Sequence, residues 1–545
     1  MTAPWLPGLF GGVAAVTLLL CTGLLAPLAG VNAEGREWTV EGIVRRAGRP
    51  VPGATIRVSG PVLAAGTTSD AAGRFLLKGT FPGTYTISAE AEGTGGAAPV
   101  TLQMNPGSAR RGVAMELKDE AVLAGAVTNP ARRPVSGATV LAWVKSSAHG
   151  GASFVTKGFD QTNDLGEFRI TELPEGRYRL VAVLPPLRPA RVAPESEATK
   201  PNQTRPGSAR FAFFPSSTEW ESAAVLSIPP GVKREALDLT LPMAPVYRTT
   251  LVVPPPSGFI AGPQAASLTI LTPVGGAFLQ VARGSVQTGE AWEVRGLPAG
   301  TYKAVAITFD TASKRTTGFG KVEFTISRSD VDLGSLPVLP AVTQTGLLHF
   351  GPKDPQQSRP EGLAVTLSAR NRPIYYGENR AARFVDGGRF VIEGAFQDDY
   401  AITVSGLPSG CYLKDASQEG RDVLRSQVHA GAGEINLTIG NDGPRVSGRT
   451  VDGEGAPVAG AALALIEEEA GPMILARSDI DGRYEFWSGV APGRHTLIAI
   501  QGLMAGEESD EEVFRQQRSR GTSLLLSPGE LRNFDVVVQT VQRQF

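Results

Sequence analysis

Short stretches in which apolar and polar residues alternate recur along this chain, separated by turns rich in glycine, proline, aspartate and asparagine. The clearest stretch reads SDIDGRYEF at residues 478–486 and continues as VAPGRHTL at residues 490–497. Tyr484 and Phe486 alternate with polar residues after the first turn, and His495 begins a similar alternation after the second. Alternation with a period of two is typical of half-buried β-strands. The stretch therefore predicts a strand, a tight turn and a second strand.

The same pattern occurs twice more, in the first third of the chain. The step from the turn glycine is twelve residues to Tyr85 and to Tyr178, and thirteen residues to His495. An Asp or Asn side chain that opens such a turn can accept a hydrogen bond from the backbone two residues on, and a closing glycine takes a positive φ without steric cost. We therefore expect one β-sandwich module to recur, with His495 as a packed aromatic in place of tyrosine.

The recurring pattern divides the chain into five modules, numbered 1 to 5, at residues 36–118, 120–243, 245–340, 342–440 and 443–543. Modules 3 and 4 keep the pattern mainly in their second halves. Module 2 contains a long loop, residues 185–207, whose composition predicts disorder. The acidic run at residues 507–512, just before Phe514, is the one helix that the sequence predicts, and we interpret its charges as a solvated face.

The first residues of the chain predict a targeting segment. Residues 4–31 carry no charged side chain, and the small residues that follow resemble a cleavage site. We predict a signal peptide over residues 1–33, with an uncleaved transmembrane anchor as the alternative because the apolar run is long enough to span a bilayer. The protein is then secreted, periplasmic or held in the cell envelope. Without Cys21 of the leader, Cys411 has no partner for an intramolecular disulfide, and we interpret it as a packed small side chain.

Composition and charge exclude several kinds of function. The chain has 65 glycines and 41 prolines among 545 residues, which favours many turns and short strands. Lys and Arg number 52 against 53 Asp and Glu, so no basic field would attract nucleic acid. The four histidines lie too far apart to form a zinc motif on one helix, and no phosphate-binding loop or nucleophile elbow is present. We predict no catalytic residue, metal ion or cofactor, and leave open whether calcium binds the Asp turns.

The shared motifs resemble those of the carboxypeptidase regulatory-like domain, a seven-stranded transthyretin-like β-sandwich with an Ig-like fold. They are a Gly-x-Val first strand, a Pro-Val-x-Gly-Ala turn, an Asp-x-x-Gly-x-Phe turn and a Pro-Gly-x-Tyr turn, and modules 1, 2 and 5 carry them most completely. The resemblance implies an all-β tandem array of about five modules, laid out like repeat proteins of the bacterial cell envelope. The zinc peptidase that accompanies this domain in carboxypeptidases is absent from the sequence. Carbohydrate binding is implied only by analogy with starch-binding-like domains of the same fold.

Two kinds of function fit this organisation. The first is a non-catalytic role in binding, adhesion or structural spacing, with a glycan or an envelope protein as partner. The second is carbohydrate recognition by exposed aromatic side chains, since Trp143 and Trp487 alternate with inward-facing residues and Tyr375 and Tyr376 lie in a polar stretch. An exposed tryptophan also serves packing between modules. An unrecognised hydrolase is the least favoured alternative.

Overall fold

The computed structural model describes residues 37–60, 66–80, 83–104, 107–148, 151–192, 205–258, 264–350, 362–369, 380–468, 473–503 and 507–541. The predicted leader, residues 1–33, and the candidate pair Tyr375 and Tyr376 lie outside these ranges. The described residues form β-strands almost throughout, together with one α-helix, α1 (Glu511–Gln516), at the place where the acidic run predicts it. The all-β fold class is therefore confirmed.

The same two-sheet topology recurs in all five modules. In module 1, β1 (Trp38–Arg46) pairs antiparallel with β5 (Arg74–Gly79), which follows the Asp turn, and parallel with the last strand, β9 (Ala109–Asp119). In the second sheet, β3 (Thr55–Ser59) pairs antiparallel with β6 (Gly83–Glu90), which follows the Pro-Gly turn. The corresponding pairs in the other modules have the same directions. Each module encloses its own apolar core between the two sheets.

The first two modules contain the following further strands. Module 1 also contains β2 (Arg49–Pro50), β4 (Thr67–Thr68), β7 (Thr94–Ala97) and β8 (Val100–Met104). The strands of module 2 are β10 (Ala121–Thr128), β11 (Thr139–Ala148), β12 (Gly151–Gln161), β13 (Glu167–Leu173), β14 (Gly176–Val183), β17 (Phe211–Phe213), β18 (Leu226–Ile228), β19 (Lys233–Arg234) and β20 (Leu239–Thr240).

The last three modules are built from the following elements. Module 3 consists of β15 (Ala190–Arg191), β16 (Arg205–Ser208), β21 (Met243–Val252), β22 (Gln264–Val274), β23 (Ala277–Gln287), β24 (Ala291–Pro298), β25 (Gly300–Asp310), β26 (Thr316–Ile326), β27 (Val331–Ser335) and β28 (Val338–Pro340). Module 4 consists of β29 (Val342–Phe350), β30 (Ala364–Ala369), β31 (Arg380–Ala381), β32 (Arg383–Phe384), β33 (Arg389–Ala395), β34 (Asp399–Ser405), β35 (Tyr412–Gln418), β36 (Arg421–Asp422), β37 (Val428–His429) and β38 (Ile435–Gly440). Module 5 consists of β39 (Arg445–Val451), β40 (Ala462–Glu467), β41 (Met473–Arg477), β42 (Arg483–Phe486), β43 (Gly493–Gln501), η2 (Glu507–Ser509), α1, η3 (Arg518–Arg520), β44 (Thr522–Leu526), β45 (Leu531–Asn533), β46 (Val536–Val537) and β47 (Gln539–Thr540).

In modules 1 and 4 the glycine of the first strand makes room for the aromatic residue that follows the Asp turn, whereas in modules 2 and 5 an added Cβ atom would meet the backbone of Leu237 and Phe534. In four modules these two residues lie opposite each other on paired strands, as Gly42 with Phe75, Gly125 with Phe168, Gly346 with Phe390, and Gly448 with Tyr484. A Cβ atom added at Gly346 would lie 2.1 Å from the Phe390 ring. Module 3 differs, because Trp292, ten residues before Tyr302 as Phe75 is before Tyr85, lies opposite Leu251 instead of a glycine.

A buried hydroxyl group just before the Asp or Asn residue forms hydrogen bonds with the backbone of the preceding turn. Ser478 Oγ accepts a hydrogen bond from Ala461 N at 2.9 Å and donates one to Val458 O at 3.1 Å. Ser69 and Thr162 make the equivalent pair of bonds in modules 1 and 2. The next residue then builds the predicted turn, since Oδ1 of Asp70, Asn163 and Asp479 each accepts two backbone amide hydrogens.

Replacing the buried Ser478 by Ala is expected to destabilise module 5 by about 1–3 kcal/mol, because the buried backbone N–H of Ala461 would lose its hydrogen-bond acceptor. Ser478→Thr is the matched control, since module 2 has Thr162 at the same place. Urea unfolding, followed by hydrogen exchange of β39 and β42 peptides, measures both variants. A loss in Ser478→Ala no larger than that in Ser478→Thr would contradict the assigned role.

The long loop of module 2 is part of module 3 where the structure describes it. β15 pairs antiparallel with β24 and β16 pairs antiparallel with β21, so the segment supplies two strands of one module 3 sheet. Leu187 also exchanges two backbone hydrogen bonds with β23 and packs against the module 3 core. The expectation of disorder is wrong for residues 190–191 and 205–208, because a strand donated to another module leaves no local periodicity.

Consecutive modules are joined by specific contacts. At the first junction Lys118 forms an ion pair with Glu175. At the junction of modules 3 and 4, Phe319 stacks on Phe396 with ring centroids 4.6 Å apart. At the junction of modules 4 and 5, the backbone N–H of Gly410 donates to the carbonyl of Trp487 at 2.6 Å, and that of Gly489 to the carbonyl of Cys411 at 2.8 Å. These contacts fix the angle between neighbouring modules.

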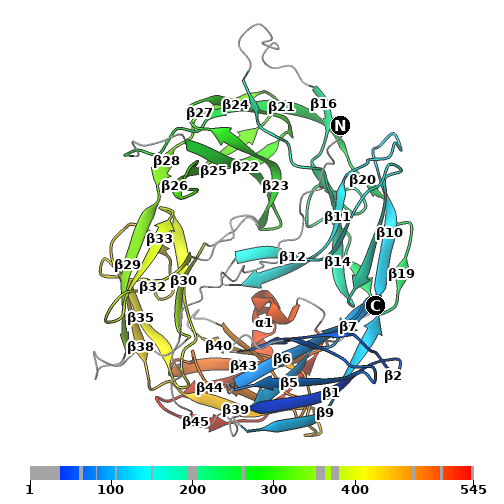
Figure 1. The fold of residues 1–545 in the computed structure, drawn as a ribbon, viewed down its shortest axis with the longest axis vertical. Helices are drawn as coiled ribbons and strands as arrows, with labels where there is room; N and C mark the ends of the chain where they lie inside the picture. The colour runs from blue at the N-terminus through cyan, green and yellow to red at the C-terminus, as the bar shows by residue number, and fades with distance from the viewer. Residues whose placement is uncertain are drawn as a thin grey trace, which may run out of the picture.

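The array closes on itself instead of extending. Figure 1 shows the modules following one another around a ring, so that module 5 (orange to red) returns to module 1 (blue). Arg110 of module 1 forms an ion pair with Asp481 of module 5 at 3.7 Å. In addition, η2 and α1 of module 5 contact β11 of module 2. The two ends of the array are therefore neighbours in space.

Candidate functional site

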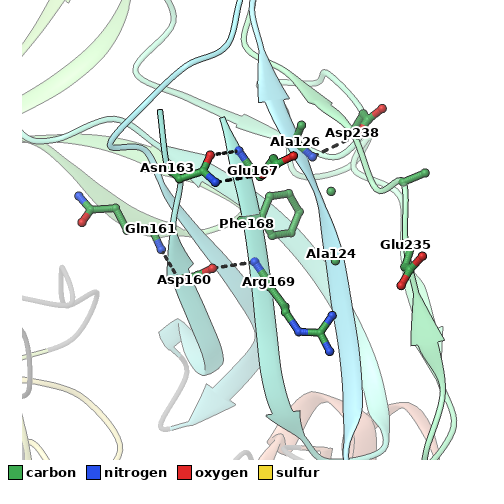
Figure 2. Close-up of a pocket in the computed structure, with 12 residues that line it drawn as sticks. Ala124, Ala126, Asp160, Gln161, Asn163, Glu167, Phe168, Arg169, Glu235 and Asp238 are labelled. Atoms are coloured by element: carbon green, nitrogen blue, oxygen red, sulfur yellow. Dashed lines mark hydrogen bonds between the residues drawn. The ribbon is translucent and has the colours of Figure 1, made fainter. Parts of the chain in front are cut away.

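An open groove on module 2 combines several polar side chains. It has a volume of about 520 Å³ and lies beside β10 and β13 (Figure 2). Its floor is made of the small residues Ala124, Gly125 and Ala126. Polar side chains surround this floor, and they are Asp160, Gln161, Asn163, Glu167, Arg169, Glu235 and Asp238. The groove thus has an acidic rim with one arginine.

Two of the four rim carboxylates accept hydrogen bonds from backbone N–H groups, and a third accepts one from a side chain. Asp160 Oδ2 accepts a hydrogen bond from Arg169 N at 2.6 Å, and Asp238 Oδ1 accepts one from Ala126 N at 3.1 Å. Glu167 Oε2 accepts one from the Asn163 side chain at 3.0 Å. Figure 2 shows these bonds along the walls of the groove. The side chains most suited to meet a ligand are therefore those of Gln161, Arg169 and Glu235, which are exposed.

Trp143 lies on the outer face of its sheet but is not exposed. Its exposed fraction is 2%, and its ring stacks on Phe154 with centroids 4.6 Å apart. The β22–β23 hairpin of module 3 covers it through Val274, Ala277 and Leu279. The expectation of an exposed platform at Trp143 is therefore wrong, because a neighbouring module fills the space that local alternation leaves to solvent.

Trp487 is an exposed aromatic of the kind that the sequence predicts. Its exposed fraction is 39%, and it follows the buried Phe486 at the end of β42. Its backbone carbonyl holds the module 4 loop at Gly410. The structure does not bring Trp487 and Trp143 to one surface, since they belong to separate modules and Trp143 is buried. A role for Trp487, Tyr375 or Tyr376 in glycan binding stays a prediction.

The described residues contain no group of three or more His, Cys, Asp or Glu side chains that could hold a metal ion. His429 is paired with Asp399 at 2.8 Å on the surface, and His495 is 3% exposed in module 5. Cys411 is half-buried against the module 4 core, and burial raises the pKa of its thiol. A raised thiol pKa lowers the thiolate fraction, so Cys411 is a weak nucleophile.

Module 3 contains a buried charge network that the sequence does not reveal. Glu293 is 3% exposed and forms ion pairs with Arg295 at 2.6 Å and with Arg248 at 3.7 Å. Arg248 in turn pairs with Asp330 at 3.5 Å, and its backbone N–H donates to the same carboxylate. Buried charges are stable when they are paired. We assign this network to the structure of module 3, because every one of its charges has an opposite partner.

Two titratable groups in module 5 are perturbed by burial. Burial and the nearby Asp479 carboxylate raise the pKa of Glu485 to about 7, against the opposing effect of Arg483. One carboxylate oxygen of Glu485 is buried without a hydrogen-bond partner. Burial lowers the pKa of His495 below its usual 6.5. No acid or base positioned for proton transfer accompanies either group among the described contacts.

Glu485 makes the stability of module 5 depend on pH. Its folded pKa lies above the unfolded value, so its contribution is fully present below about pH 4.5 and is lost as the pH rises through about 7. His495 acts oppositely and destabilises the fold as the pH falls below about 6.5.

Relative to the wild type, Glu485→Gln is expected to gain roughly 1–3 kcal/mol in free energy of unfolding between pH 5 and pH 8. Urea unfolding at both pH values checks this, with the exposed Glu454→Gln as control; a constant difference from the wild type would refute the assignment.

One part of the chain matches a known protein family. Residues 39–118, which form module 1, match the family model of the carboxypeptidase regulatory-like domain. The module 1 topology and the motifs described above agree with this match. No curated protein matches the chain.

Several solved structures of bacterial surface proteins align with the chain. The streptococcal ancillary pilin is 11% identical, with a TM-score of 0.19, over 55% of this chain and 99% of that one. The major pilin subunit BcpA of Bacillus cereus is 9% identical, with a TM-score of 0.12, over 77% of this chain and 99% of that one. The TIE protein of Bacillus anthracis is 11% identical, with a TM-score of 0.14, over 89% of this chain and 68% of that one. At such TM-scores these similarities do not bear on what the chain does.

Proposed function

We propose that this chain is a non-catalytic binding protein of the cell envelope, in which five β-sandwich modules form a closed scaffold that presents fixed surfaces to a partner. The observation that carries this proposal is ring closure through Arg110 and Asp481 and through α1 against β11. An array that serves as a spacer keeps its ends apart, whereas here the end modules meet. Closure therefore favours binding over structural spacing.

The location in the envelope rests on the predicted leader at residues 1–33. Among the residues that the structure describes, no helix has the length and apolar character needed to cross a membrane. An anchor, where one is used, is then supplied by the leader. The binding surfaces of the ring would face the outside of the cytoplasmic membrane.

The groove of module 2 favours a binding role. There Asp160 accepts backbone amide hydrogens with both carboxylate oxygens and Asp238 accepts one with Oδ1, as structural carboxylates do. The sole aromatic side chain of its lining, Phe168, is 3% exposed and offers no stacking platform. A ligand of this groove would be held by polar contacts with Gln161, Arg169 and Glu235, which suits a hydroxyl-rich glycan or a polar segment of a protein.

Glycan-array binding of the full chain tests which partner is used. We would compare the wild type with Arg169→Ala/Glu235→Ala in the groove and with Trp487→Ala at the exposed tryptophan. Binding that the double variant loses would place a carbohydrate site in the groove, and binding that Trp487→Ala loses would place it in module 5. Absence of binding to every glycan would favour a protein partner. Turnover of any bound glycan would contradict the non-catalytic proposal.

A further inference from the structure

The closing contact of the ring is made by an insert that belongs to module 5. The insert comprises η2, α1 and η3, lies between β43 and β44, and contacts β11 of module 2. Figure 1 shows α1 on the inner side of the ring, next to the sheet of β40 and β43. The insert is thus the element by which module 5 contacts module 2, which lies three modules earlier in the chain.

Apolar packing fixes the insert to its own module. Phe514 of α1 is fully buried against the outer face of the second sheet, in contact with a cluster formed by Ala462, Ala464, Ile466, Ile498 and Ile500. Asp510 caps the helix by accepting a hydrogen bond from Glu512 N at 3.0 Å. Separation of the ring at the contact with β11 would therefore leave the insert on module 5.

The facing surfaces carry opposite charges. Five of the six residues at 507–512 are acidic. On the side of module 2, β11 has no acidic residue and contains Lys145, and its hairpin partner β12 contains Lys157 together with Asp160. Asp510 and Glu511 are 8% and 9% exposed, Glu507 and Glu508 are half-buried, and Glu512 is exposed. The interpretation of this run as a solvated face is therefore wrong for Asp510 and Glu511, which are buried.

The other closing contact is also electrostatic. The Arg110 and Asp481 side chains are 33% and 47% exposed. Ion pairs with such exposure contribute at most about 1 kcal/mol and are screened by salt. The junctions from module 2 to module 5 also contain stacked aromatic rings, donated strands and backbone hydrogen bonds, whereas the junction of modules 1 and 2 has the exposed Lys118–Glu175 ion pair. The Arg110–Asp481 ion pair is therefore weak compared with the contacts at the junctions from module 2 to module 5.

We propose that the acidic insert is an electrostatic latch, which holds the ring closed at low ionic strength and lets it open at the seam between module 5 and modules 1 and 2 when its charges are screened or reversed. Opening would separate module 5 from modules 1 and 2 and leave each of them folded. The latch rests on the ring closure that supports the proposed function, and it adds a means by which ions or a charged partner regulate the shape of the scaffold.

Small-angle X-ray scattering of the full chain tests the latch. Glu507→Lys/Glu508→Lys reverses two charges of the insert, and Glu434→Lys/Glu454→Lys makes the same change of net charge at exposed positions outside the seam. The compact-chain radius of gyration for this length is about 24 Å. We expect the wild type and the control to be close to that value at low salt, and the insert variant to exceed theirs by at least about 5 Å. The wild type is expected to expand between about 0.01 M and about 1 M NaCl, where the Debye length falls from about 30 Å to about 3 Å.

The alternative outcomes are distinct. An insert variant as compact as the control at every salt concentration would overturn the latch and leave ring closure intact. A wild type that is already extended at low salt would overturn ring closure and with it the support for the proposed function. Hydrogen exchange of β40 and β43 separates opening from unfolding: retained protection in an expanded variant supports the latch, whereas lost protection overturns it.

Discussion

Replacement of Gly448 by Ala is expected to destabilise module 5 by about 3–5 kcal/mol, enough to unfold it under mild conditions. A Cβ atom at this position would lie 1.9 Å from the carbonyl oxygen and 2.6 Å from the carbonyl carbon of Phe534. These are backbone atoms of the connection between β45 and β46, which pair with β39 on either side of it, so they cannot move aside without breaking the sheet.

Gly453→Ala is the matched control for this change. Gly453 lies in the same module, and a Cβ atom there would meet no atom within 4 Å. We expect its effect to stay within about 0.5 kcal/mol. Urea unfolding of both variants, followed by hydrogen exchange of β39 and β42, measures the difference. A Gly448→Ala protein as stable as Gly453→Ala would contradict the close approach of β39 to Phe534.

Trp143→Ala is expected to cost about 3–5 kcal/mol and to loosen modules 2 and 3 together. The indole is buried, stacks on Phe154, and donates a hydrogen bond from Nε1 to Thr156 Oγ1 at 3.0 Å. It also belongs to the apolar cluster that spans the two modules. Its removal leaves a cavity at the junction that neither module can fill alone.

Trp487→Ala provides the comparison, because this tryptophan is 39% exposed. We expect a loss of at most about 1 kcal/mol for it. Hydrogen exchange of β12 and β23 is expected to increase in Trp143→Ala and to stay unchanged in Trp487→Ala. Equal and small effects of the two substitutions would show that Trp143 is not covered by module 3.

Local features of the fold could be predicted from the sequence because they depend on residues close together in the chain. The turns at Asp70 and Asp479 form because their side chains bond to amides two and four residues on. The inward direction of Tyr484 and Phe486 follows from alternation along one strand. The role of the Ser478 hydroxyl could also be predicted from the sequence, since a Ser or Thr precedes the turn in modules 1 and 2 as well.

Features that depend on other modules could not be predicted in this way. The strands β15 and β16 are short and gain their hydrogen bonds from β24 and β21 of the next module. The burial of Trp143 depends on a hairpin more than a hundred residues away. The groove on module 2 arises where β10, β13 and a later segment meet, so the residues that line it show no motif.

Ring closure is the central claim, and a distance between modules 1 and 5 tests it most directly. Spin labels at Arg111→Cys and Ile480→Cys, in a chain without Cys21 and Cys411, flank the Arg110–Asp481 ion pair. Pulsed electron resonance is expected to give a narrow distance distribution near about 20 Å, since each label lies one residue from the contact. A broad distribution centred beyond about 60 Å, as in an extended array of five domains, would contradict closure.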